Sequence, residues 1–82
     1  MTIKTKYEVG QHIWVVYEQK GEVGVYDDYI SSIGWEDYLF YMTQETYEEL
    51  KEESVILYDD LTKLAERIKE TMEKIRGVEN AN

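Results

Sequence analysis

The first two thirds of the chain consist of short apolar runs separated by glycines and acidic residues. Residues 11–17 (QHIWVVY) are β-branched and aromatic, and the polar segment that follows them contains Gly21. This pattern predicts a strand that enters a hairpin, with residues 22–30 as its partner strand and Gly24 as the site of a bulge or sharp bend. Two further strands are predicted at residues 37–42 and 55–58.

Two of these strands are apolar on both faces. In the first strand, Ile13 and Val15 point one way while Trp14 and Val16 point the other. The strand at residues 37–42 alternates between apolar side chains in the same manner. A two-sided apolar strand has to be covered twice, so we expect one face to line a small barrel or curved sheet and the other to meet a helix or a second subunit.

In the C-terminal part of the chain, the apolar residues recur at the spacing of an α-helix. Asp59 and Asp60 are candidate N-cap residues, and Gly77 is a candidate C-terminal cap. The pattern predicts a helix over residues 60–76 and a frayed tail over 78–82. Its apolar stripe is predicted to pack on the sheet, with a coiled-coil seam as the alternative. The stripe consists of Leu61, Leu64, Ile68, Met72 and Ile75.

Residues 43–54 (TQETYEELKEES) form an acidic insert that allows two structures. Thr46 and Glu49 have the spacing of a capping box, which favours a helix of one or two turns. Such a helix would place a row of carboxylates along one edge, at Glu45, Glu49 and Glu53. An ordered acidic loop fits the sequence equally well, and both structures remain open.

The order of these elements predicts a single α+β domain over residues 1–82. We expect a small antiparallel SH3-like β-barrel or curved sheet of four to five strands with a packed C-terminal α-helix. Three patterns extend the comparison: a glycine before an alternating strand at 9–16, the succession Val23, Ile30 and Ile33, and the run VILYDDL at 55–61. In these the chain resembles the SH3-like and Tudor-like small-barrel proteins of phages and other mobile elements of Gram-positive bacteria. The resemblance implies a fold, and it transfers no functional residue.

Charge is distributed very unevenly along the chain. From Glu18 to Asp60 there are thirteen carboxylates and two lysines, and the whole chain has a formal net charge of −9. Tyrosine and tryptophan residues are interleaved with these acids. A segment of this kind repels nucleic acid and attracts basic surfaces, so direct binding of nucleic acid is not expected.

The sequence contains no recognisable arrangement of residues for catalysis or cofactor binding. It has no cysteine, and its single histidine, His12, lies in an apolar strand, where a packed or edge position is more common than a catalytic one. The acidic doublets lack the spacing of a calcium loop, and neighbouring strand residues point to opposite faces. We therefore expect a protein without enzymatic activity, cofactor or metal.

The class of function that remains is protein interaction, in which aromatic side chains anchor an interface and carboxylates steer a basic partner. Our hypothesis is a phage or mobile-element inhibitor that occupies a basic, nucleic-acid-binding surface of a host defence protein. It would mimic phosphate charge in the manner of anti-restriction and anti-CRISPR inhibitors. The alternative is an SH3- or Tudor-like peptide-binding or accessory scaffold domain. The predicted partner-binding residues are Asp27, Asp28, Tyr29, Trp35, Glu36, Asp37, Glu45, Glu48, Glu49, Glu52 and Glu53.

The sequence also bears on compartment and assembly. It shows neither a secretory signal pattern nor an apolar run of the length that crosses a bilayer. The lack of cysteine fits a reducing compartment. We expect a soluble cytoplasmic protein without a membrane partner, and a chain this short leaves a homodimer open.

Overall fold

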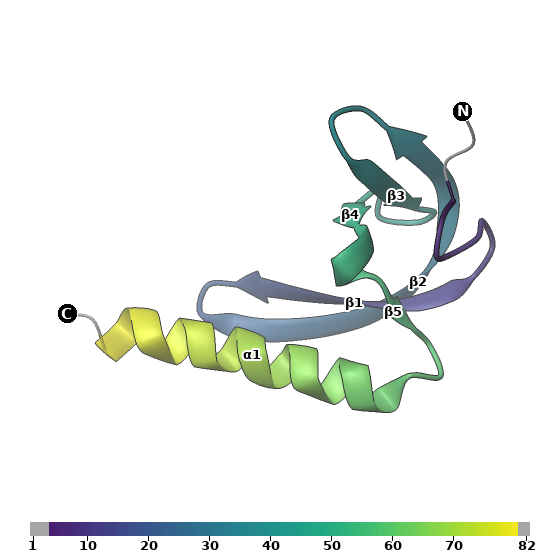
Figure 1. The fold of residues 1–82 in the computed structure, drawn as a ribbon. Helices are drawn as coiled ribbons and strands as arrows, with labels where there is room; N and C mark the ends of the chain where they lie inside the picture. The colour runs from purple at the N-terminus through teal and green to yellow at the C-terminus, as the bar shows by residue number, and fades with distance from the viewer. Residues whose placement is uncertain (1–3, 81–82) are drawn as a thin grey trace.

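The computed structural model describes residues 4–80, with side chains up to Gly77. It has a five-stranded antiparallel sheet in the order β4-β3-β2-β1-β5, followed by one α-helix (Figure 1). The predicted α+β class is confirmed. The elements are β1 (His12–Gln19), β2 (Glu22–Trp35), β3 (Leu39–Thr43), β4 (Glu49–Lys51), the 3-10 turn η1 (Glu52–Ser54), β5 (Ile56–Leu57) and α1 (Leu61–Asn80).

The predicted hairpin is formed by β1 and β2. Its two-residue turn is Lys20-Gly21, and both residues have positive φ, at 54° and 78°. Such a turn matches the twist of two antiparallel strands. The bulge expected at Gly24 is absent, because the pairing of β1 with β2 is unbroken along the hairpin. Gly24 instead leaves room for the ring of Tyr17, since a Cβ at Gly24 would lie 2.1 Å from that ring.

Strand β2 is longer than predicted and takes part in both halves of the curved sheet. Its first half pairs with β1, and its second half pairs with β3 after a shift in register between Ile30 and Ser32. The curved sheet is confirmed, but the barrel is not closed, because β4 and β5 are the two outer strands. β5 has only two residues, and η1 separates it from β4. The two halves of the sheet enclose a small core of Tyr7, Ile13, Val15, Ile30, Tyr41 and Val55.

Of the two structures predicted for the acidic insert, the helix is wrong. The chain turns after Thr43, forms the short β4, and reaches β5 through the single turn η1. Tyr47 has a φ of 56°, in the left-handed region that a right-handed helix cannot contain. The insert is an ordered acidic loop with a short strand, so Glu45, Glu49 and Glu53 do not form a helical row. The predicted strand at 55–58 is correspondingly reduced to Ile56–Leu57.

Helix α1 lies along the outer side of the β1–β2 hairpin (Figure 1). The side chain of Asp60 accepts a hydrogen bond from the backbone N–H of Lys63 at 3.1 Å, as expected of an N-cap. Residues 78–80 extend the helix instead of forming a tail, and residues 81–82 lie outside the described part. No helix within residues 4–80 combines the length and the apolar character needed to cross a membrane.

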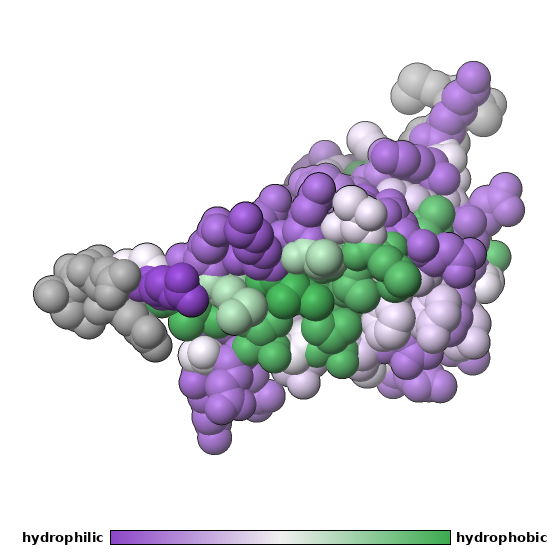
Figure 2. Space-filling view, turned by 90° about the horizontal axis from the view of Figure 1, so that it is seen from below, coloured by the Kyte–Doolittle hydropathy of each residue, from purple (hydrophilic) through white to green (hydrophobic). Residues whose placement is uncertain are grey.

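The apolar stripe of α1 packs on the sheet only in part. None of the described helix side chains is fully buried, and Leu61 and Met72 are 63% and 47% exposed. Seen from the helix side, apolar side chains form a continuous strip bordered by polar ones (Figure 2). The sheet therefore covers one side of the stripe and leaves the other side open.

Candidate protein-interaction surface

The eleven predicted partner-binding residues do not form one continuous patch. Asp27 and Tyr29 lie on the outer face of the β1–β2 hairpin, and Asp28 is buried on the opposite face. Trp35 ends β2 beside the loop that carries two further acids. The remaining predicted residues lie around β4 and η1. The structure therefore separates the prediction into an aromatic surface on the hairpin and an acidic surface around β3 and β4.

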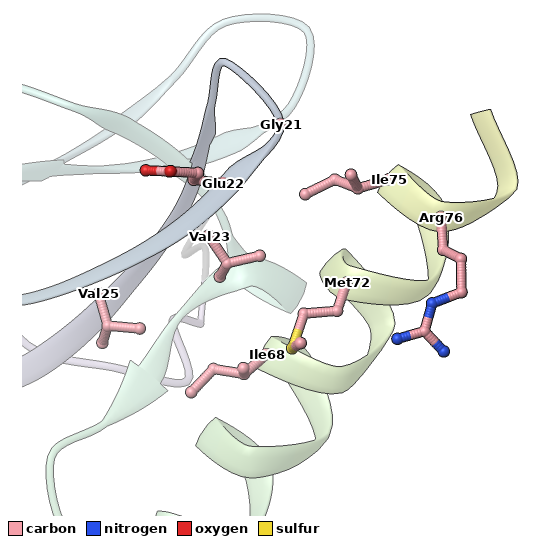
Figure 3. A pocket seen from close by; sticks show the side chains of 8 residues that line it. All are labelled: Gly21, Glu22, Val23, Val25, Ile68, Met72, Ile75 and Arg76. Carbon is pink, nitrogen blue, oxygen red and sulfur yellow. The ribbon is translucent and has the colours of Figure 1, made fainter. Parts of the chain in front are cut away.

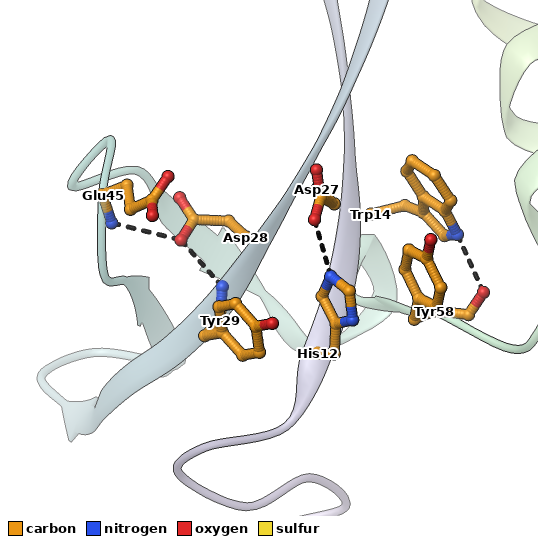
Figure 4. Close-up of polar contacts among 7 residues, drawn as sticks. All are labelled: His12, Trp14, Asp27, Asp28, Tyr29, Glu45 and Tyr58. Carbon is orange, nitrogen blue, oxygen red and sulfur yellow. Dashed lines mark hydrogen bonds and ion pairs between the residues drawn. The ribbon is translucent and has the colours of Figure 1, made fainter.

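The aromatic surface is a stack of four rings, which we call the aromatic stack. The ring of His12 lies between Tyr29 and Tyr58, at centroid distances of 4.5 and 3.8 Å, and Trp14 stacks on Tyr58 at 4.7 Å (Figure 4). The interplanar angles are 11°, 9° and 15°, so all four rings are nearly parallel. This arrangement follows from the register, because His12 and Trp14 alternate onto the outer face of β1 and His12 is directly opposite Tyr29.

Polar contacts fix the geometry of the stack. Nε2 of His12 lies 2.7 Å from Oδ2 of Asp27, and Nε1–H of Trp14 donates to the carbonyl oxygen of Tyr58 at 2.9 Å (Figure 4). Tyr29 and Tyr58 are each 39% exposed. An open hollow of about 370 Å³ lies beside the stack, lined in part by Tyr58 and Asp59. Aromatic edges and faces next to carboxylates suit the side chain of a lysine or arginine.

Sequence reasoning recognised His12 as a packed strand residue and missed the stack. Tyr58 comes from the segment after β5 and reaches the stack only because β5 pairs with β1. The alternation of His12 and Trp14 on one strand face was the available signal. The position of Tyr58 depends on the sheet order, which the sequence pattern does not contain.

Asp28 is not available to a partner, which corrects its assignment as a partner-binding residue. It is fully buried and accepts hydrogen bonds from the backbone N–H groups of Tyr29, Glu45 and Thr46 at 2.7, 3.1 and 3.2 Å. The hydroxyl of Thr46 donates a fourth, at 2.9 Å. Burial opposes the charged form, but these hydrogen bonds outweigh it, so the pKa of Asp28 lies below its usual value. Asp28 therefore holds the turn between β3 and β4 in place (Figure 4).

The acidic surface belongs to residues 36–54, which we call the anionic lobe. It contains β3, β4, η1 and their loops, and forms one end of the molecule (Figure 1). The lobe carries seven carboxylates and a single lysine, Lys51. Within the part of the chain that the structure describes, the ion pairs are His12–Asp27 and Arg67–Glu70, and neither involves the lobe. Arg67 of the helix donates to the backbone carbonyl oxygen of Glu53 at 2.7 Å, but no carboxylate of the lobe forms an ion pair with a described helix residue.

Two of these seven carboxylates have internal roles. Glu49 accepts a hydrogen bond from the hydroxyl of Tyr38 at 2.6 Å, and this bond raises the pKa of Tyr38. Glu52 accepts from the hydroxyl of Tyr41 at 2.7 Å and from the backbone N–H of Lys6, and these bonds lower the pKa of Glu52. The side chains of the other five are exposed to solvent. They are Glu36, Asp37, Glu45, Glu48 and Glu53.

The described residues of neither surface are arranged as the ligands of a metal ion. Within residues 4–80 the structure shows no group of three or more His, Asp or Glu side chains arranged to hold a metal ion. Comparison of the chain with models of known families, with curated proteins and with solved structures gives no match.

Proposed function

We propose that the protein is a non-enzymatic interaction module that docks its anionic lobe on a basic protein surface. The observation that carries the proposal is the set of seven carboxylates in the lobe, with one lysine and no ion pair to a described residue. Carboxylates concentrated at one end of a small domain attract a cationic surface and are repelled by phosphates. The proposed partner is therefore a nucleic-acid-binding protein. The lobe would occupy the basic surface to which the phosphates of the nucleic acid otherwise bind.

An exposed aromatic residue supports this docking surface. Trp35 is 58% exposed at the end of β2, directly before Glu36 and Asp37. Tryptophan is the side chain that most often contributes large binding energies in interfaces, and neighbouring carboxylates steer the encounter. Together with the resemblance to small-barrel proteins of phages and mobile elements, this leads us to the class of anti-restriction or anti-CRISPR inhibitors. Such a protein acts in the cytoplasm of the host cell.

The proposal predicts that neutralising the exposed acids of the lobe weakens binding. The test variant carries Glu36→Gln, Asp37→Asn, Glu45→Gln and Glu48→Gln, and the control carries Glu18→Gln, Glu66→Gln, Glu70→Gln and Glu73→Gln. Both remove four charges, but the control acids lie in the hairpin and helix. Tagged proteins are used to capture partners from nuclease-treated bacterial lysate. We expect the lobe variant to bind about thirtyfold more weakly than the wild type, because roughly half a kcal/mol per charge gives about 2 kcal/mol for four charges.

Salt and competing nucleic acid provide the second measurement. Capture by the wild type should fall steeply between about 0.05 and 0.5 M salt, because exposed charges are screened over that range. Duplex DNA or RNA added to the lysate should displace the protein from its partner. If the lobe variant and the control capture the same proteins equally, or if salt has no effect, the anionic lobe is not the docking surface.

The aromatic stack favours a second candidate function, the recognition of a basic peptide. The hollow of about 370 Å³ beside Tyr58 and Asp59 is the specific observation. This candidate predicts that Tyr58→Ala abolishes binding of a lysine- and arginine-rich peptide. The fluorescence of Trp14 would report it in a Trp35→Phe background, because the chain has only two tryptophans. Tyr47→Ala, at a 78% exposed tyrosine outside the stack, is the control and should bind normally. If the peptide leaves the fluorescence of the Trp35→Phe parent protein unchanged, this function is excluded.

A further inference from the structure

The loop between β3 and β4, residues 44–48, holds one bulky side chain in an unfavourable backbone conformation. Tyr47 has a φ of 56°, in the left-handed region where the Cβ of an L-residue lies too close to the following carbonyl oxygen. Turns that need this conformation usually have glycine or asparagine at such a position. Tyrosine therefore makes the loop less stable than asparagine would.

The fold gains little from the side chain that causes this loss. Tyr47 is 78% exposed, which is the largest exposed fraction among the large apolar and aromatic side chains that the structure describes. A ring with this exposure buries very little area and adds little to the core. The stability of the protein therefore does not explain why tyrosine occupies this position.

The loop is held in place on both sides of Tyr47. Before it, the buried carboxylate of Asp28 accepts hydrogen bonds from the backbone N–H and the hydroxyl of Thr46, at 3.2 and 2.9 Å. After it, the backbone N–H of Glu48 donates to the hydroxyl of Thr43 at 2.7 Å, and the carbonyl oxygen of Glu48 accepts the backbone N–H of Thr43 at 3.1 Å. The tyrosine is thus presented to solvent from a preorganised backbone, which reduces the entropy lost on binding.

The charges next to Tyr47 determine which partner it suits. Glu45 and Glu48 are both exposed, and neither forms an ion pair with a described residue. The face of a tyrosine ring attracts the cationic groups of lysine and arginine, and neighbouring carboxylates add to that attraction. The ring and the two acids therefore complement the same basic surface.

We propose that Tyr47 is an anchor residue through which the anionic lobe binds its basic partner. This inference rests on the proposed function of the lobe and adds to it a residue without charge. Tyrosine is one of the residue types that contribute most binding energy in interfaces. Its ring would lie against a lysine or arginine of the partner's phosphate-binding surface, with Glu45 and Glu48 beside it. The unfavourable loop conformation is then retained for binding and not for stability.

The first experiment uses asparagine, which tolerates the left-handed conformation, to measure the cost of the tyrosine. Tyr47→Asn should raise the midpoint of urea unfolding by about 0.5 M, because it relieves the backbone and removes no buried group. Lys20→Asn is the matched control outside the lobe, since Lys20 has a φ of 54° at the hairpin turn and should gain stability in the same way. If Tyr47→Asn lowers the midpoint instead, the tyrosine stabilises the fold and the proposal is overturned.

The second experiment measures binding by the full chain. The probe is the set of basic proteins that a phosphate-bearing cation exchanger retains from nuclease-treated bacterial lysate. Tyr47→Asn should bind them at least about tenfold more weakly than the wild type, whereas Lys20→Asn should bind normally. Met72→Gln controls for the loss of an exposed apolar side chain, because Met72 is 47% exposed on the wall of the groove between the hairpin and α1 (Figure 3). It should also bind normally.

The lobe variant with four neutralised acids separates this inference from the proposed function. If the lobe variant loses binding and Tyr47→Asn binds like the wild type, the lobe docks without Tyr47 and the anchor role is wrong. If the wild type captures nothing, or the lobe variant binds as well as the wild type, the proposed function fails and the anchor role fails with it. If Met72→Gln loses as much binding as Tyr47→Asn, capture depends on exposed apolar surface in general, and Tyr47 is not an anchor.

Discussion

Asp28→Ala is expected to unfold a large fraction of the protein at room temperature. The carboxylate is fully buried and accepts four hydrogen bonds, three of them from backbone N–H groups. Alanine leaves these donors without a partner in the turn between β3 and β4. We expect a loss of about 3–5 kcal/mol, close to the whole stability of many small domains. Urea denaturation followed by tryptophan fluorescence measures it.

The neighbouring residue supplies the matched control. Asp27→Ala removes one carboxylate from the same strand, but Asp27 is about half-exposed and its contact with His12 lies at the surface. An exposed pair of this kind contributes about 0–1 kcal/mol. If the two alanine variants lost equal stability, the hydrogen bonds to Asp28 would not be holding the turn.

Asp28 also gives the stability a defined dependence on pH. Because its pKa is lowered in the folded state, its contribution is fully present above the unfolded pKa, about 4, and is lost as the pH falls through the folded value. The wild type should therefore lose stability on acidification below about pH 4. Asp28→Asn, which cannot carry the charge, should lose less over the same range.

Much of the fold was predictable because it depends on local patterns. The hairpin follows from a β-branched run ending at Lys20-Gly21, and the helix follows from the spacing of Leu61 to Ile75 together with the cap at Asp60. The alternation of β1 places Ile13 and Val15 in the core. These features need only a few neighbouring residues, so the chain order is sufficient to predict them.

The features that were missed depend on contacts between distant residues. Asp27 and Asp28 are chemically equal in the sequence, and only the sheet register decides that Asp28 is buried. Asp28 then binds the backbone of Glu45 and Thr46, which excludes the helix that the capping-box pattern favoured. In the same way, the pairing of β5 with β1 brings Tyr58 to His12. The sequence was sufficient to predict which types of residue form the candidate surfaces. It was not sufficient to predict how these residues are arranged.

Tyr41→Ala should cause the second large loss of stability. The ring is completely buried and meets Tyr7 edge-on at 5.5 Å. Its hydroxyl donates to Glu52 and accepts the backbone N–H of Tyr7, so Tyr41 joins β3 to η1 and to the N-terminal segment. Removing a buried aromatic ring costs about 3–5 kcal/mol. The control is Phe40→Ala on the outer face of β3, where we expect about 1–2 kcal/mol by the same urea measurement. A greater loss at Phe40 would contradict the placement of the core.

Tyr41→Phe separates the hydroxyl from the ring. It keeps the packing and removes the hydrogen bond to Glu52, so a loss of about 1–2 kcal/mol is expected at neutral pH. That bond lowers the pKa of Glu52 in the folded state, and its stabilisation is therefore present above the unfolded pKa, about 4.3, and disappears as the pH falls through the folded value. The gap in stability between wild type and Tyr41→Phe should narrow on acidification. A gap that stayed constant from neutral to acidic pH would show that the hydroxyl stabilises the fold through the backbone of Tyr7 and not through the charge of Glu52.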